Sequence, residues 1–228
     1  MRRTIANRLD VLMTKRLQFF FTAVLVAGLS SGCASDPPAS WREAATQSHP
    51  WGYYTGTPVT QWNPDGRTMT LLRELRYTDP QGTVWVAPAG SVVDGASIPR
   101  SLWSFMGGPF EGKYRNASVL HDVSYTEKNR PPQDCDRMFY NAMRCSGVSA
   151  IEAKTMYYAL LRFGWHWDFA IKRAKPVKIG RKTVARAEPE SPVTVMAAQQ
   201  EIISARNWIR KSGANVEQIE QRAEAGTH

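Results

Sequence analysis

Short segments of alternating apolar and polar residues follow residue 50. Residues 57–62, 67–77 and 83–86 are rich in β-branched and aromatic side chains, which is typical of strands. Two turn signals separate them, Asn63-Pro64-Asp65-Gly66 and Asp79-Pro80-Gln81-Gly82, in which Pro fixes φ and Gly supplies a positive φ. The pattern predicts a small antiparallel sheet of two to four strands.

A helical period replaces this alternation further along the chain. Residues 113–128, 132–145 and 149–163 carry apolar side chains at helical spacing. Pro132 suits a first helical turn, and Ser149 with Glu152 three residues later has the form of a capping box. We therefore predict an α+β fold, in which a small N-terminal antiparallel sheet precedes a three-helix core.

The same patterns set the expected domain limits. We predict a tether over 33–50, a globular domain over 51–170, a basic linker over 171–192 and a helical C-terminal tail over 193–228. The linker carries seven Lys or Arg and no acidic residue before position 188. The tail contains an amphipathic helix at 193–211, which we expect to lie outside the core domain.

The N-terminus has the form of an export signal. A basic start precedes the uncharged apolar run 17–29, whose 13 residues are fewer than the roughly 20 that span a bilayer. Residues 29–33 (LSSGC) resemble the bacterial lipobox, and the resemblance implies cleavage after residue 32 and acylation of Cys33, for example with palmitate. The alternative is an ordinary cleaved signal followed by an incidental cysteine. Met13 offers a second possible start.

The expected location follows from these residues. Ala34 follows Cys33, and the lipobox resemblance then implies sorting to the outer membrane, facing the periplasm. Removal of five basic residues and one acidic residue with the signal lowers the formal net charge from +9 to +5. An exported protein with this mild charge gives no argument for nucleic-acid binding, whereas anionic lipid or cell wall suits it. Beyond residue 33 no apolar stretch reaches spanning length.

Two cysteines remain in the predicted domain. Cys135 and Cys145 lie ten residues apart on one predicted helix, a separation of about 15 Å at 1.5 Å per residue. A disulfide needs its Cα atoms within about 7 Å. Both cysteines are therefore predicted to be buried, unbridged side chains.

Candidate chemistry is concentrated in three motifs: DGASIPR at 94–100, His121-Asp122-x-x-Tyr125 on a helix, and Asp136 on the next helix. Together they resemble the bacterial and phage family known as domain of unknown function 1353. The resemblance covers roughly residues 55–165 and implies a shared fold but no established activity.

The helical part of this pattern also resembles the core of secreted and parvoviral phospholipases A2. That resemblance implies that His121 is a general base activating water, that Asp136 orients it, and that Asp122 binds Ca²⁺ beside loop carbonyls. A neutral imidazole titrates near working pH, and a carboxylate can stabilise its cation. The chain departs from these enzymes at the calcium loop, for which 94–95 and 107–108 are both candidates in unexpected positions.

Each candidate also has a structural interpretation. His121 and Asp136 have the form of a structural hydrogen-bonded pair as well as a catalytic dyad. Asp94, Gly95 and Ser97 suit either a turn and helix cap or a group that binds metal or orients substrate. No G-x-S-x-G elbow surrounds Ser97, which argues against a nucleophile.

Two further features near the end of the domain stay open. His166 is the second histidine of the predicted domain, too few for a typical zinc site. Trp165, Trp167 and Phe169 suit either an aromatic patch at a lipid interface or packing of the third helix.

Two hypotheses for function follow. In the first, the protein is a Ca²⁺-assisted lipid or ester hydrolase of phospholipase A2 type. In the second, it is a non-catalytic envelope lipoprotein, of prophage type, that binds lipid, cell wall or a protein partner. The enzyme hypothesis requires that Asp136 be hydrogen-bonded to His121 and that His121 line an open cleft.

Overall fold

Short antiparallel strands build the first part of the domain. The computed structural model describes residues 50–95, 97, 99, 102–103, 107–169 and 192–226. Within them the strands are β1 (Tyr53–Thr55), β2 (Thr60–Trp62), β3 (Met69–Leu71), β4 (Leu75–Thr78), β5 (Val84–Ala87) and β6 (Val92–Val93). They pair as two antiparallel sheets, in the orders β1-β4-β5 and β2-β3-β6.

Both predicted turns are confirmed, and aspartate side chains stabilise each of them. Between β2 and β3, the Asp65 carboxylate accepts hydrogen bonds from the backbone N–H groups of Arg67 and Thr68. Between β4 and β5, Asp79 accepts from the N–H groups of Gln81 and Thr83 in the same way. These are the local side-chain to backbone bonds for which Asp is favoured in turns.

The segment predicted as one strand over 67–77 is divided. Its first part, β3, pairs with β2 and β6, whereas its second part, β4, pairs with β1 and β5. The chain bends between them at Leu72, whose side chain is exposed. Alternation continues on both sides of the bend, so the pattern alone did not reveal it.

Helices make up the remainder of the described chain. They are the short 3₁₀ helix η1 (Gly112–Tyr114), α4 (Arg115–Glu127), α5 (Pro132–Cys145), α6 (Ala150–Phe163), α7 (Pro192–Ser212) and α8 (Val216–Ala225). Pro132 stands at the start of α5, and the Ser149 hydroxyl accepts a hydrogen bond from the Glu152 N–H at the start of α6. The α+β class and the three central helices are thus as predicted.

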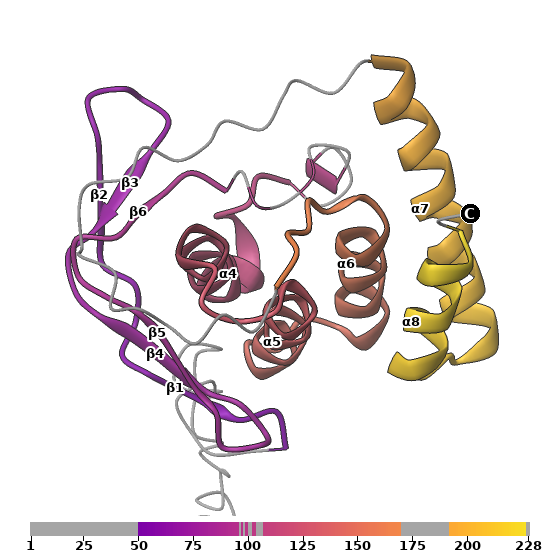
Figure 1. Cartoon of the computed structure of the whole chain (residues 1–228), viewed down its shortest axis with the longest axis horizontal. Coiled ribbons are helices and arrows are strands. Elements are labelled where there is room, and N and C mark those ends of the chain that lie inside the picture. The colour runs from indigo at the N-terminus through magenta and orange to yellow at the C-terminus, as the bar shows by residue number, and fades with distance from the viewer. Residues whose placement is uncertain are drawn as a thin grey trace, which may run out of the picture. The chain divides into compact units, whose positions relative to one another are not determined.

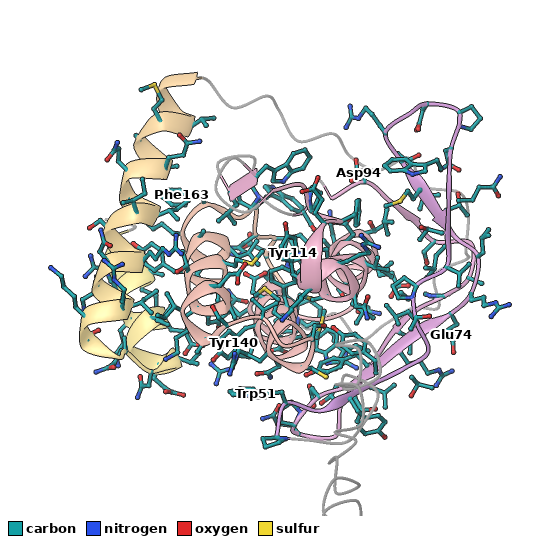
Figure 2. All side chains as sticks on the ribbon, turned by 180° about the vertical axis from the view of Figure 1, so that it is seen from behind. Trp51, Glu74, Asp94, Tyr114, Tyr140 and Phe163 are labelled. Carbon is teal, nitrogen blue, oxygen red and sulfur yellow. The ribbon has the colours of Figure 1, made fainter. Side chains whose placement is uncertain are left out.

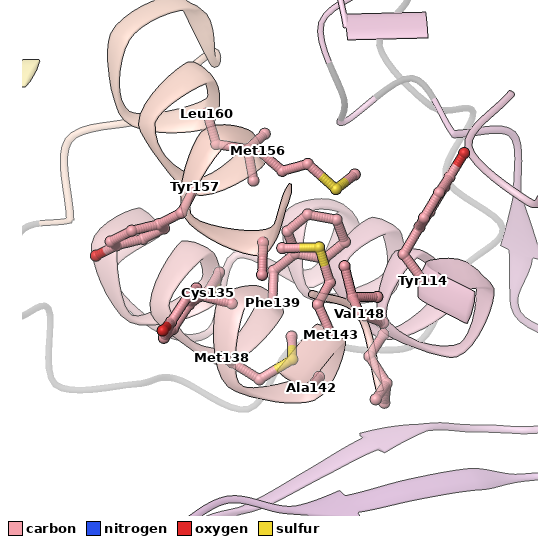
Figure 3. Packing of buried hydrophobic residues seen from close by; sticks show 14 of the residues in the cluster. Tyr114, Cys135, Met138, Phe139, Ala142, Met143, Val148, Met156, Tyr157 and Leu160 are labelled. Atoms are coloured by element: carbon pink, nitrogen blue, oxygen red, sulfur yellow. The ribbon is translucent and has the colours of Figure 1, made fainter. Parts of the chain in front are cut away.

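The hydrophobic core lies between the strands and α4, α5 and α6. Helix α4 contacts β5, β6 and α5, while α5 in turn contacts β1 and α6 (Figure 1). Side chains fill the space between the strands and these helices (Figure 2). Methionine and aromatic side chains of α5 interlock with those of α6, among them Phe139, Met143 and Met156 (Figure 3). Cys135 and Cys145 are both buried on α5 and are not joined by a disulfide, as predicted.

Contrary to our expectation, the C-terminal helices pack against the core. Helices α7 and α8 both pack on α6 (Figure 1) and belong to the same compact unit as the rest of the domain, Ser40–His228. Ile202 and Ile209 of α7 and Ile219 of α8 are buried. The apolar face of 193–211 was recognised from the sequence, but its partner was not, because a helical pattern does not say against what it packs.

Candidate active site

A tight loop after β6 is hydrogen-bonded to Asp122, the aspartate that follows His121 on α4. The Asp122 carboxylate of α4 accepts hydrogen bonds from the backbone N–H groups of Asp94, at 3.1 Å, and Gly95, at 2.6 Å. It also accepts a short hydrogen bond from the Ser97 hydroxyl. Gly95 has φ of +73°, and a Cβ there would lie 2.1 Å from Pro109 Cγ. Glycine is therefore required where the loop approaches the domain.

His121 is held between two side chains from different segments. Its Nδ1 lies 2.9 Å from Ser97 Oγ, and its Nε2 lies 2.8 Å from Asp136 Oδ1. The rings of Tyr125 and Phe139 lie against the imidazole, with centroids 4.1 and 4.9 Å away. Both ring nitrogens are thus engaged, and packing fixes the plane of the ring.

Asp136 is the centre of the network. Besides His121, it accepts a 2.6 Å hydrogen bond from the Tyr125 hydroxyl and contacts His166 Nε2 at 2.9 Å. Burial raises the pKa of Asp136, but hydrogen bonds from His121 and His166 outweigh burial and hold the pKa below its usual value. Asp136 therefore carries a negative charge beside the imidazole.

Asp122 differs from Asp136 in its electrostatics. Burial raises the pKa of Asp122, and hydrogen bonds from Ser97 and Gly95 offset only part of this effect. The donors to Asp122 are backbone amides and a hydroxyl, whereas Asp136 faces two histidines. The two carboxylates thus serve different ends of one network, and only Asp136 is placed to stabilise an imidazolium.

All the candidate residues of the three motifs meet in this network. His121, Asp122, Tyr125, Asp136 and Ser97 contribute side chains, while Gly95 contributes its backbone N–H. Asp94 also donates its backbone N–H to Asp122, and its carboxylate lies 3.7 Å from the Arg67 guanidinium. The structure therefore joins segments that the sequence separates by some forty residues.

The enzyme hypothesis required that His121 line an open cleft, and the imidazole itself does not meet this requirement. His121 and Asp136 are completely buried, packed among the aromatic rings of the core. The two ends of the network are more accessible, because Ser97 is partly exposed and the His166 side chain is 28% exposed. Any access to the network from solvent is therefore through these ends.

His166 was missed as a member of the site. The sequence placed it in an ambiguous segment, and we considered it only as a zinc ligand. The structure ends α6 at Phe163 and turns the following residues back over Tyr125, with the Trp167 ring edge-on to the tyrosine ring at 4.9 Å. The Trp167 indole N–H is buried and has no hydrogen-bond partner within the described ranges. A helix that stops at a glycine before Trp-His-Trp was the available signal.

The aromatic cluster of this segment is divided between the two interpretations. Trp167 packs on Tyr125, as the core interpretation predicts. Trp165 is 57% exposed and Phe169 is 38% exposed. The Lys128 ammonium lies 4.3 Å from the centre of the Trp165 ring. Trp165 and Phe169 are thus exposed apolar side chains within three residues of His166.

These features define an α+β domain with a buried Ser–His–Asp network. Residues 69–160 match the family model described as "Protein of unknown function (DUF1353)", the family that the motifs of the sequence resemble. The matched segment runs from β3 to α6 and includes each predicted side chain of the network.

Two curated relatives are themselves uncharacterised. The chain is 39% identical over 140 residues to the uncharacterized protein y4jT of Sinorhizobium fredii, covering 58% of this chain and 42% of that protein. It is 33% identical over 111 residues to the uncharacterized protein y4iH of the same organism, covering 49% and 46%. The alignments thus span less than half the length of these relatives. No solved structure matches the chain.

The comparisons test neither the predicted lipid anchor nor the predicted calcium site. No described helix combines the length and apolar character needed to cross a bilayer. The described residues contain no group of three or more His, Cys, Asp or Glu arranged to hold a metal ion. Cys33 and the basic linker lie outside the described residues.

Proposed function

We propose that the protein is a lipid-anchored envelope hydrolase of ester bonds, with His121 as its general base. The observation that carries the proposal is the position of the imidazole, 2.8 Å from Asp136 on one side and 2.9 Å from a hydroxyl on the other. This is the order of groups that acyl-transfer chemistry requires: a proton donor to be activated, a base, and a carboxylate that stabilises the charged base.

The protonation states follow from the contacts. With Asp136 ionised, the neutral imidazole places its proton on Nε2 and donates it to that carboxylate, which leaves the Nδ1 lone pair directed at Ser97. During reaction Nδ1 takes a proton, and Asp136 stabilises the resulting imidazolium. Tyr125 and His166 hold Asp136 in place for this role. A positioned base of this kind contributes about 10²–10⁴-fold to rate.

Calcium fits the arrangement of Asp122 poorly. A cation requires free oxygen lone pairs, but both Asp122 oxygens accept hydrogen bonds, from two backbone amides and from Ser97. The N–H groups also present positive charge where the cation would lie. The role of Asp122 that these contacts support is to anchor the loop, and no step of the mechanism is assigned to calcium, whose binding stays a prediction.

The proposed envelope location favours lipid substrates. The lipobox-like residues before Cys33 favour an acyl anchor, which would hold the domain at a membrane surface. Trp165 and Phe169 present exposed apolar side chains beside His166, and Lys128 adds a positive charge that suits anionic lipid. Phospholipid esters are therefore the first substrates to test, ahead of cell-wall components.

The test measures fatty-acid release by the full-length protein, purified from the membrane fraction and reconstituted in phosphatidylethanolamine–phosphatidylglycerol vesicles. We expect His121→Gln to lower the rate at least about 100-fold. Ser118→Ala, which removes a buried hydroxyl from the same helix but outside the network, is the matched control and should keep the rate. Parallel assays with Ca²⁺ or a chelator test the calcium prediction. The lipid anchor predicts that the Cys33→Ser variant is found in the soluble fraction instead of the membrane fraction.

The alternative is a non-catalytic envelope lipoprotein, and the complete burial of His121 and Asp136 favours it. Here the network only locks the loop at 94–97 onto α4 and α5. This alternative predicts that His121→Gln alters stability but that neither protein releases fatty acid. Equal release by the wild type and by His121→Gln would refute the hydrolase.

A further inference from the structure

The contacts of His121 indicate which group would attack the ester in a hydrolase of this geometry. A base that activates water needs a ring nitrogen that water can reach. Here Nε2 is bound to Asp136, and Nδ1 is bound to Ser97 Oγ. The imidazole is completely buried, whereas Ser97 is partly exposed. Water cannot take the place beside Nδ1 unless Ser97 leaves it.

We propose, on the basis of the proposed function, that Ser97 is a covalent nucleophile and that Ser97, His121 and Asp136 form a catalytic triad. A buried base needs no cleft of its own when its proton donor is a side chain that reaches the surface. The triad uses the ring in the reverse sense from the usual serine hydrolase, because Nδ1 faces the serine and Nε2 faces the carboxylate. Either nitrogen of a neutral imidazole can act as the acceptor.

The loop around Ser97 replaces the strand–turn–helix elbow whose absence argued against a nucleophile. Asp122 accepts hydrogen bonds from the backbone N–H groups of the consecutive residues Asp94 and Gly95, and more weakly from the N–H of Ser97 at 3.4 Å. Gly95 supplies the positive φ that brings the backbone against Pro109. Asp122 is thus a positioning residue, which fixes the serine over His121 through the loop backbone and through its contact with the Ser97 hydroxyl.

The covalent step conserves atoms and charge. The Ser97 hydroxyl has one proton, which it donates to Asp122 at rest, and the O–H first turns about the Cβ–Oγ bond to face His121 Nδ1. Ser97 Oγ then forms a bond to the ester carbonyl carbon while this proton passes to Nδ1, and Asp136 stabilises the imidazolium. The bond from that carbon to the leaving alcohol oxygen then breaks, and His121 returns the proton to the alcohol. Acylation removes the Ser97 hydroxyl from its contact with Nδ1, and water takes that place, attacks the acyl carbon and gives a proton to His121 Nδ1. The Ser97 Oγ–acyl bond breaks, the serine regains its proton and a carboxylic acid leaves.

A fluorophosphonate probe tests the nucleophile directly. Attack by Ser97 Oγ on phosphorus expels fluoride, transfers the serine proton through His121 and leaves a phosphonylated serine. With full-length wild-type protein in detergent, we expect peptide mass spectrometry to find the adduct on Ser97. Ser97→Ala should abolish it, and His121→Gln should slow labelling at least about 100-fold. Ser118→Ala, a serine of α4 outside the network, should be labelled at the wild-type rate.

Wild-type mapping keeps the test independent of variant folding. An adduct at Ser97 with His121-dependent kinetics supports the triad. An adduct at another residue, or none, overturns it. Fatty-acid release provides a second test. If Ser97→Ala releases fatty acid at the wild-type rate while His121→Gln does not, Ser97 is not the nucleophile, but the proposed hydrolase stands. Absence of both labelling and release in the wild type would overturn both proposals.

Discussion

Two regions of this molecule use polar side chains to join segments that are distant in sequence, and they do so in opposite settings. Between the loop after β6, α4 and α5, the side chains of His121 and Asp136 are completely buried. Between α5, α6 and α8, Arg137 and Glu220 are 38% and 35% exposed and meet at 2.8 Å, with the Tyr157 hydroxyl on the same carboxylate. One set is sealed in the core, and the other lies at its edge.

This difference in burial determines how each set stabilises the fold. A buried carboxylate loses its hydration and must be compensated by several partners, which Asp136 has in His121, His166 and Tyr125. A half-exposed ion pair gains little, because water competes for it and salt screens it. The α6–α8 contact therefore depends on apolar residues such as Ile219, while the motif region depends on its hydrogen bonds.

The largest expected effect is that of Asp136→Ala. Removing one partner of a buried charged pair costs about 3–5 kcal/mol, because the remaining polar groups stay buried without a partner. We expect the free energy of unfolding, measured by urea denaturation at neutral pH, to fall by at least about 3 kcal/mol. Asp134→Ala is the matched control, since Asp134 is an exposed aspartate in the first turn of the same helix.

The control should cost no more than about 1 kcal/mol, the usual contribution of an acidic residue to a helix N-terminus. A similar loss in both variants would mean that the buried network contributes no more than a surface charge. The contrast between the two regions would then be wrong.

Much of the motif region was predictable from the sequence. The DGASIPR loop, His121 and Asp136 were recognised as one group, and the helix boundaries allowed His121 and Asp136 to be placed opposite each other. The prediction succeeded because helical spacing is regular and because the motif residues are chemically unusual for a core. The depth of burial was not predictable, since it depends on aromatic side chains such as Phe139 packing around the ring.

What the sequence did not reveal depends on contacts between distant segments. His166 lies thirty residues after Asp136 and follows a helix end, so no local pattern connects it with that carboxylate. The same holds for α7, whose apolar stripe is visible in the sequence while its binding face on α6 is not. The bend that separates β3 from β4 is likewise set by pairing with other strands rather than by its own residues.

The second prediction tests whether α7 is part of the cooperative domain. Ile202 is completely buried, and Ile202→Ala removes apolar contacts and leaves a cavity, which costs about 2–3 kcal/mol at a site that can partly collapse. We expect a single unfolding transition, shifted to lower urea, when fluorescence and circular dichroism are compared. Ile203→Ala, at a neighbouring exposed position, should shift it by less than about 1 kcal/mol.

A separate early transition in Ile202→Ala, with the main transition unchanged, would show that α7 unfolds independently of α4 and α5. The helical tail would then resemble the appendage expected from the sequence, despite its contacts with α6.

The smallest effect is expected at the half-exposed contact. Glu220→Gln removes the charge that faces Arg137 but keeps a side-chain oxygen that can still accept the Tyr157 hydroxyl. Because both charged groups are more than a third exposed, the free energy of unfolding should fall by no more than about 1 kcal/mol, and less in high salt. Glu217→Gln is the matched control, since Glu217 is 3.6 Å from the same guanidinium but more exposed. If Glu220→Gln lowered the free energy of unfolding as much as Asp136→Ala does, the two contacts would contribute equally to stability. Burial would then not be what separates the motif region from the C-terminal helices.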